Sequence, residues 1–312
     1  MPLRPAVCLA ALSAALVAAP ALGEDNPTHA LDYAYPTGEH LLRYDIVQSN
    51  STGAAGSGDM TITTRMDIPL TIAAGGGSDA RDVTMTVRRI TATLVADDME
   101  RIVDSDRPDT LMPGLPLDVL CEATFEAKIA ANGEIAEFTG VEAFVEKAEM
   151  GGDDPDARAE AVTGVSSGLQ QLLAEPMVYL PAGRVAAGDT WTVERKVYGL
   201  PIMGAQKVHA ETLTCTLESV TRTDTGRIAR VTIDGATKLL SGATATDPAT
   251  LTKTGHVAYN LDTGDLAAHH IELAGKKTVA MGDEKVTVTA KTVIDAQVDP
   301  PAEDDDDADD AS

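Results

Sequence analysis

The chain has 312 residues and a formal net charge of −25 at pH 7, with one Trp and three Phe. A chain this acidic repels phosphate backbones and anionic lipid surfaces, so its composition argues against nucleic-acid partners and electrostatic membrane attachment. The shortage of aromatic side chains also argues against the stacking platforms that bind unpaired bases or sugars.

Residues 1–23 have the pattern of a secretory signal peptide. Arg4 gives a positive start, residues 7–19 form a short apolar core, and Ala21-Leu22-Gly23 ends it with small residues. We therefore expect an extracytoplasmic protein, periplasmic or secreted, cleaved near Gly23. No later segment approaches the roughly 18 uninterrupted apolar residues of a membrane-spanning helix, so we expect no transmembrane helix in the mature chain.

After an exposed lead-in at 24–40, a first β-rich half is predicted at 41–140. Its clearest strand, 59–72, alternates apolar and polar side chains without a slip, which indicates burial on one face. Pro69 cannot donate to a ladder, so that end of the strand is expected at an edge or a bulge. A second strand, 82–95, changes phase at Arg88-Arg89 and is expected to bend there.

The rest of the first half is predicted as an acidic, Pro-rich connection at 97–118 and a hairpin. Alternation from Cys121 to Ile129 followed by Asn132-Gly133 is typical of a strand that enters a tight β-turn. Because Cys8 leaves with the signal peptide, Cys121 and Cys215 remain as a pair. In an oxidising compartment they form a possible disulfide; the alternative is two buried reduced thiols.

A helical insert is predicted at 141–180. Apolar residues recur at helical spacing from Val141 to Ala148 and again from Ala161 to Leu173, with Asp156 as a possible N-cap of the second helix. Within that helix, Gly164-Val165-Ser166-Ser167-Gly168 matches the spacing of a serine nucleophile elbow. The elbow requires a strand, a turn and a helix, whereas this segment follows no strand, so we expect no catalytic residue here.

A second β-rich half is predicted at 181–299, followed by a disordered acidic tail at 300–312 that carries seven carboxylates. Its strands are separated by the turns Asp224-Thr225-Gly226 and Asp262-Thr263-Gly264. The fold class is therefore mainly β (α+β): long antiparallel strands in two similar halves, as a curved sheet or half-barrel, with two helices inserted between them. The expected strands of this half are 190–197, 208–220, 227–240, 251–261, 266–279 and 285–298.

The segment from Leu180-Pro181 to Gly188-Asp189-Thr190-Trp191 resembles one in uncharacterised secreted bacterial proteins, the domain of unknown function 6263 group. The resemblance covers roughly 38–298 and includes an opening strand like Leu41–Val47. It implies no activity. We expect Gly188-Asp189 to form a turn into the second half and Trp191 to pack in the core. At the level of the fold alone, the pattern also resembles half-barrel carriers of the lipoprotein-transport type.

Histidines are the first candidates for metal ligands, and no metal site is predicted from them. Adjacent residues of a strand point to opposite faces, so His269 and His270 cannot readily share an ion. His256 is expected to face away from His270. The acidic run 104–109 lacks the glycine and terminal glutamate of a calcium loop. We therefore predict no catalytic, cofactor-binding or metal-binding residue, and no cofactor.

The sequence favours a non-catalytic binding module for an apolar small molecule or an envelope protein. One-sided strands with methionines on their apolar faces suit an adaptable apolar concavity, unless those faces close on each other and on the helices. Two alternatives remain: a structural envelope or surface component, and a secreted hydrolase with a site built from distant carboxylates or His270. The apolar residues concerned are Met60, Met66, Ile68, Leu70 and Met85.

Overall fold

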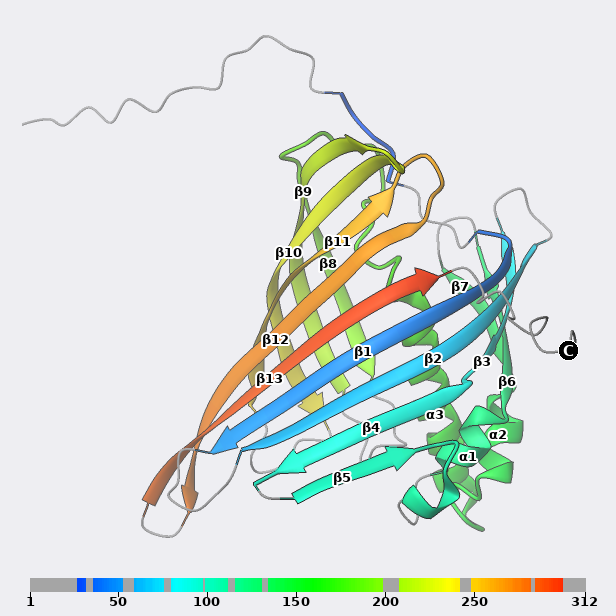
Figure 1. Cartoon of the computed structure of the whole chain (residues 1–312), viewed down its shortest axis with the longest axis vertical. Helices are drawn as coiled ribbons and strands as arrows, with labels where there is room; N and C mark the ends of the chain where they lie inside the picture. Colours follow the sequence, from blue (N-terminus) through cyan, green and yellow to red (C-terminus); the bar gives the residue numbers. More distant parts are fainter. Residues whose placement is uncertain are drawn as a thin grey trace, which may run out of the picture.

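Antiparallel strands make up most of the computed structural model of this chain (Figure 1). Within the described residues, thirteen strands form one sheet. Eleven of them follow one path in the order β7-β6-β3-β2-β1-β13-β12-β11-β10-β9-β8, while β4 pairs with β2 and β5 with β4. The structure describes residues 27–31, 36–52, 59–75, 80–97, 99–111, 116–130, 134–198, 208–241, 248–281 and 284–299.

The elements follow the predicted division into strands, helices and strands. The strands of the first half are β1 (Gly38–Thr52), β2 (Met60–Ala74), β3 (Arg81–Thr86), β4 (Arg89–Ala96), β5 (Met99–Asp104), β6 (Thr124–Ile129) and β7 (Ile135–Thr139). The helical elements are the short 3₁₀ helix η1 (Pro108–Thr110), α1 (Leu117–Cys121), α2 (Val141–Lys147) and α3 (Pro155–Ala174). The strands of the second half are β8 (Thr190–Tyr198), β9 (Val208–Thr223), β10 (Gly226–Ser241), β11 (Thr250–Asn260), β12 (Leu266–Met281) and β13 (Glu284–Asp299).

The first and last strands are neighbours in the middle of the sheet. β1 pairs with β13 from Leu41 opposite Asp299 to Thr52 opposite Val288. The two halves therefore form one continuous sheet, and the middle of the chain connects its two ends, β7 and β8. Helices α2 and α3 lie in that connection.

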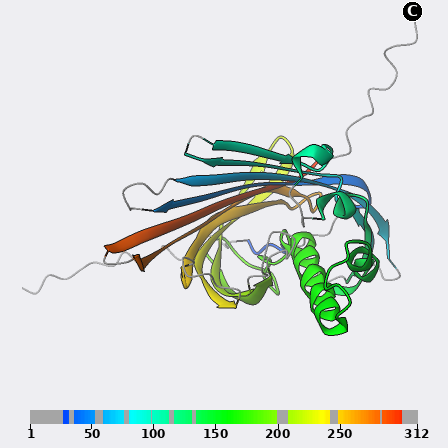
Figure 2. The same ribbon diagram turned by 90° about the horizontal axis from the view of Figure 1, so that it is seen from below.

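Helix α3 covers the inner face where the sheet remains open. It contacts β7 at one end of the sheet and β8 at the other. Figure 2 shows the long helix α3, in bright green, on the concave side of the curved sheet. Val165, Leu169 and Leu173 of α3 are buried there. The concave side is thus the core of the protein.

The bend predicted at Arg88-Arg89 is present and explains the position of Pro69. Strand β2 pairs with β4 as far as Asp67 and with β3 from Leu70 onward. Pro69 lies between these two ladders, where the missing N–H costs no hydrogen bond on this side. The predicted bulge is therefore a fork at which β3 and β4 separate.

The C-terminal end of α3 is held by aromatic side chains of three strands. The Tyr44 hydroxyl of β1 donates to the Leu172 carbonyl (2.6 Å), and the Tyr259 hydroxyl of β11 donates to that of Pro176 (2.7 Å). Trp191 Nε1 of β8 donates to the Tyr179 carbonyl (3.1 Å). Helix ends leave carbonyls without intrahelical partners, and here the sheet supplies donors. Trp191 packs against the core, as predicted.

Helix α3 begins earlier than predicted. Its N-cap is Asp154 and not Asp156, because the Asp154 carboxylate accepts the N–H groups of Asp156 (2.9 Å) and Ala157 (3.4 Å). Pro155 then occupies the first helical position, where a missing N–H costs nothing.

The predicted connection at 97–118 contains a strand and a turn of helix that the sequence did not reveal. Met99 and Ile102 of β5 are 72% and 44% exposed. This edge strand therefore lacks the one-sided burial that an alternation of apolar and polar residues indicates. Cys121 ends α1, and the strand expected from this cysteine begins only at Thr124.

Several predicted segments fall outside the described residues. These are the signal peptide at 1–23, the acidic tail at 300–312 and the turn at Asn132-Gly133, although β6 and β7 pair as the predicted hairpin. Part of the lead-in is described, and His29 there forms a β-bridge with Val185. Among the described helices, none has the length and apolar character needed to cross a membrane.

Replacing Tyr259 with Phe tests how strongly the sheet holds α3. We expect the free energy of unfolding to fall by about 1–3 kcal/mol, because the buried Pro176 carbonyl loses its donor. Denaturant unfolding monitored by circular dichroism measures this change. Thr214→Val, which removes an exposed hydroxyl from β9, should change stability by less than about 0.5 kcal/mol. Equal effects of the two substitutions would contradict this role.

Candidate functional site

A cluster of charged side chains is buried where the end of α3 meets the second half of the sheet. Four strands and the turn after α3 each contribute to it. Its charged members are Glu175, Arg195 of β8, Glu211 of β9 and Lys253 of β11, and Thr237 of β10 lies beside them. The Glu211 and Lys253 side chains are 1% and 4% exposed, so both ions have left water.

Arg195 joins the helix end to the sheet. Its Nη2 donates to Glu175 Oε2 (2.8 Å) and its Nε donates to Glu211 Oε2 (2.8 Å). Arg195 and Glu211 are directly opposite in the β8–β9 ladder, so strand pairing sets their approach. A planar guanidinium can bond two carboxylates at once, which a single ammonium does less well.

Lys253 provides the second positive charge. Its Nζ donates to both carboxylate oxygens of Glu211 (2.9 and 3.1 Å) and lies 3.7 Å from Glu175 Oε1. The Thr237 hydroxyl donates to Glu211 Oε1 (3.2 Å), and the Tyr179 hydroxyl donates to Glu175 Oε1. Two carboxylates thus balance two cations, and every carboxylate oxygen has a partner.

The environment keeps Glu175 ionised and Tyr179 protonated. Burial raises the pKa of a carboxyl, but here the charges of Arg195 and Lys253 outweigh it and hold the pKa of Glu175 well below its usual value. Burial and the nearby Glu175 charge raise the pKa of Tyr179 well above its usual value. A hydroxyl that donates to a carboxylate is consistent with both states.

His269 borders the cluster without a hydrogen bond. Its Nε2 lies 3.8 Å from Glu175 Oε1, and neither ring nitrogen has a hydrogen-bond partner among the described residues. The His269 and Tyr179 ring centres are 6.0 Å apart. The carboxylates and cations of the cluster are paired with one another, so its geometry suits holding α3 on the sheet.

The sequence contained a signal for this cluster that its analysis missed. Glu211 is in phase with the buried Leu213, Cys215 and Leu217 of β9. Arg195 and Lys253 likewise occupy inward positions of their strands. A charged residue in the apolar phase of a one-sided strand indicates a buried ion pair, because an unpaired buried charge is too costly.

A hollow of about 490 Å³ opens at the edge of the sheet formed by strand termini, where the turns after β9 and β11 meet the start of β1. Its apolar lining residues are Pro36, Ile228, Leu266, Ala267 and Val298. Its polar lining residues are His40, Thr225, Asn260 and Asp265. His40 is in phase with the buried Leu42 and Tyr44 of β1, and its Nε2 is buried without a hydrogen-bond partner among the described residues.

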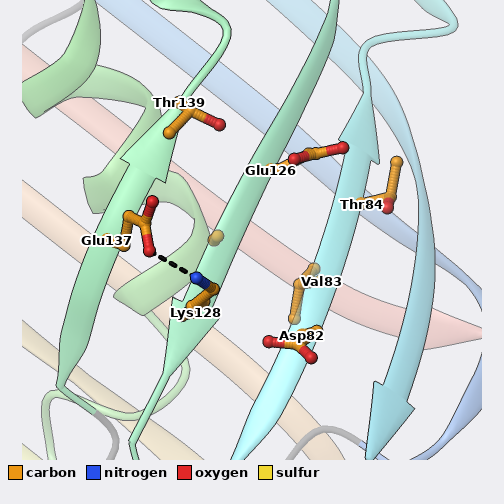
Figure 3. A pocket seen from close by; sticks show the side chains of 8 residues that line it. Asp82, Val83, Thr84, Glu126, Lys128, Glu137 and Thr139 are labelled. Carbon is orange, nitrogen blue, oxygen red and sulfur yellow. Dashed lines mark hydrogen bonds and ion pairs between the residues drawn. The ribbon is translucent and has the colours of Figure 1, made fainter. Parts of the chain in front are cut away.

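A second hollow, of about 230 Å³, lies on the outer face over β3, β6 and β7. Figure 3 shows that Asp82, Glu126, Lys128 and Glu137 project from these strands around it. Lys128 Nζ donates to Glu137 Oε2 (2.6 Å), and this bond raises the pKa of Lys128. Its exposed, polar walls are those of an ordinary solvated sheet face.

The histidine prediction was wrong in one respect. His256 and His270 are directly opposite each other in the β11–β12 ladder and share the outer face, whereas His269 is buried on the inner face. The cause is a bulge: Ala258 pairs with Ala268 but the next residue, Tyr259, pairs with Leu266. One extra residue reverses the face of every later side chain.

The other candidate residues are not members of the ion cluster and do not line the hollow, although Cys215 is close enough to the cluster to feel the charges of Lys253 and Arg195. Cys121 and Cys215 are free thiols, so the structure does not contain the possible disulfide. Ser166 lies inside α3, where its hydroxyl accepts from Gln170 (2.8 Å), as expected for a helix and not for a nucleophile elbow. Gly188 has a φ of 93°, and the Asp189 carboxylate accepts from the Ala186 N–H (2.8 Å), which confirms the predicted turn.

Glu211→Gln tests the ion cluster. We expect a loss of about 3–5 kcal/mol in the free energy of unfolding, because Arg195 and Lys253 lose a buried counter-charge. Glu218→Gln is the matched control: it lies in the same strand but forms an exposed pair with Arg230 (2.8 Å), worth at most about 1 kcal/mol. Chemical denaturation measures both, and similar losses would contradict a special role for the buried pair.

Stability should fall as the pH is lowered below about 4.5, the ordinary pKa of a glutamate carboxyl. Because the pKa of Glu175 is depressed in the folded state, the unfolded chain binds more protons there in that range, so acid favours unfolding. Thermal unfolding from pH 7 to pH 3 measures the slope. Glu175→Gln should be less stable at pH 7 and show a shallower decline; an unchanged slope would contradict the assignment.

Comparisons with known proteins place the chain in a family but give no activity. A model described as a family of unknown function (DUF6263) matches residues 79–264. None of the curated proteins matches. A structure titled "lipid-protein interactions in lipovitellin" covers 86% of this chain at 10% identity with a TM-score of 0.45, and this chain spans 26% of its length. The translocator domain of the autotransporter NalP from Neisseria meningitidis covers 84% of this chain at 9% identity, with 88% of its own length matched and a TM-score of 0.20.

The family match confirms the resemblance drawn from the sequence, over a shorter range than the expected 38–298. It extends from residue 79 to the β11–β12 turn and so includes every described helix and the residues from Glu175 to Lys253. Because the match covers more than half of the chain, the protein belongs to the DUF6263 family, whose function is unknown.

Proposed function

We propose that the protein is a non-catalytic extracytoplasmic binding module that takes a small amphipathic molecule in the hollow beside His40. The hollow carries this proposal. Its volume of about 490 Å³ is within the range of about 300–1,000 Å³ typical of small-molecule sites. Its lining combines apolar and polar side chains, which suits a ligand with an apolar body and a polar group.

Polar side chains of the lining suit a polar group on the ligand. His40, Thr225, Asn260 and Asp265 line the hollow, and such groups can exchange hydrogen bonds with a ligand hydroxyl or amine. Leu266 and Val298 offer apolar surface for the rest of the ligand.

The inner face of the sheet is a less suitable ligand site than the hollow, because it is already filled. Met66, Ile68, Leu70 and Met85 are each at most 6% exposed and belong to the core cluster that includes α3. These apolar faces therefore close on each other and on the helices, which was the alternative to an open concavity. The extracytoplasmic location in the proposal rests on the signal-peptide pattern of residues 1–23.

Two other functions have less support. A secreted hydrolase needs a nucleophile beside an acid–base pair, whereas Ser166 lies inside α3 and the buried carboxylates are paired with Arg195 and Lys253. The remaining candidate base is His270, whose ring lies against Asp295 and His256 on the outer face. A structural envelope component would use the same fold without a ligand. Native mass spectrometry separates this case from a binding module, because a bound small molecule adds mass that disappears on denaturation.

Ala267→Trp should abolish binding by filling the hollow. We expect titration with a fluorescent long-chain fatty acid to show saturable binding for the natural protein and at least a tenfold weaker affinity for this variant. Ala280→Trp is the matched control, since Ala280 is exposed on the same strand away from the hollow. Equal affinities for the two variants, or no saturable binding by the natural protein, would contradict the proposal.

A further inference from the structure

Two histidines face each other on the outer surface of the sheet, and neither of them lines the hollow. His256 of β11 and His270 of β12 are directly opposite in the ladder, with ring centres 5.7 Å apart and ring planes 34° apart. Ladder pairing fixes the backbone beneath both rings, so they are held near each other before any ligand arrives.

A third residue orients one of the rings. His270 Nδ1 lies 2.7 Å from Asp295 Oδ1, and a carboxylate can only accept, so Nδ1 carries the proton. The lone pair of His270 is therefore on Nε2. Metal-binding histidines characteristically give their other N–H to a carboxylate, which fixes the tautomer and the ring direction.

We propose that His256 and His270 form a surface site for a divalent first-row transition-metal ion, with Asp295 as a positioning residue. Metal–nitrogen bonds of about 2.0–2.1 Å bring two imidazole centres to about 5 Å, close to their present separation. Imidazole is a preferred ligand of copper, nickel and zinc, and copper(II) is bound most tightly in the general affinity order.

The charges around the pair do not repel a cation. Arg230 is a cation close enough to act on His256. Arg230 is itself paired with Glu218 (2.8 Å). Asp295 adds negative charge on the same face, and Asp45, opposite it in the β1–β13 ladder, is paired with Arg65 (2.7 Å).

The site provides two protein ligands, and water would complete the coordination. Among the described residues no set of three or more His, Cys, Asp or Glu side chains is placed to hold a metal. This distinguishes the pair from a closed structural zinc site, which uses four protein ligands. Selective affinity for copper(II) or nickel(II) over magnesium(II) is therefore expected.

Calorimetric titration of the mature full-length protein with copper(II) at pH 7.4 tests the proposal, with electron paramagnetic resonance to count bound nitrogens. We expect one site per chain with two nitrogen ligands. His256→Ala and His270→Ala should each weaken binding at least tenfold, and Asp295→Asn roughly 10–100-fold. His29→Ala is the control and should bind like the natural protein.

The acidic tail is present in every variant, so its weak attraction for cations cancels in the comparison. Circular dichroism checks that the variants fold, and we expect them to do so because the substitutions lie on an outer face. Binding that is unchanged in the His256→Ala, His270→Ala double variant would overturn the proposal. A copper spectrum with only oxygen ligands would overturn it as well. Neither result bears on fatty-acid binding in the hollow.

Discussion

The structure depends on covering the inner face of a sheet that does not close. In the part of the chain that the structure describes, thirteen strands form a curved sheet with one apolar face, and β7 and β8 end its main path. Helix α3 covers this face and contacts both end strands. Its position is fixed at its C-terminal end, where tyrosine and tryptophan side chains bond its last carbonyls and those that follow.

The buried ion cluster adds directional bonds to the apolar contact between the C-terminal end of α3 and the sheet. The apolar contacts of Leu169 and Leu173 are non-directional, whereas the Arg195 fork bonds Glu175 and Glu211 in one arrangement. A buried ion pair contributes little net stability compared with a well-packed apolar substitute. We infer that its contribution is to favour one register between the helix end and strands β8, β9 and β11.

Much of the fold could be predicted because most strands are buried on one face. The alternation in β2, the glycine-containing turns that end β9 and β11, and the helical spacing around Val165 all placed elements correctly. Strand β5 was missed because Met99 and Ile102 are exposed at an edge. The hollow was not predictable either, since Pro36, Ile228 and Val298 meet only through pairing of distant strands. The His256–His270 pair depended on a one-residue bulge that leaves no mark in the pattern of apolar residues.

Pairing of β1 with β13 has a consequence for how the protein is made. Leu41 lies opposite Asp299, so the centre of the sheet joins positions from the two ends of the chain. Contacts this distant in sequence slow folding, because a long loop must close before they form. One side of β1 has no neighbour until the last strand leaves the ribosome or the translocation channel. During that interval the edge of β1 can pair with other chains, so the newly made protein needs protection from aggregation until its C-terminal strand arrives.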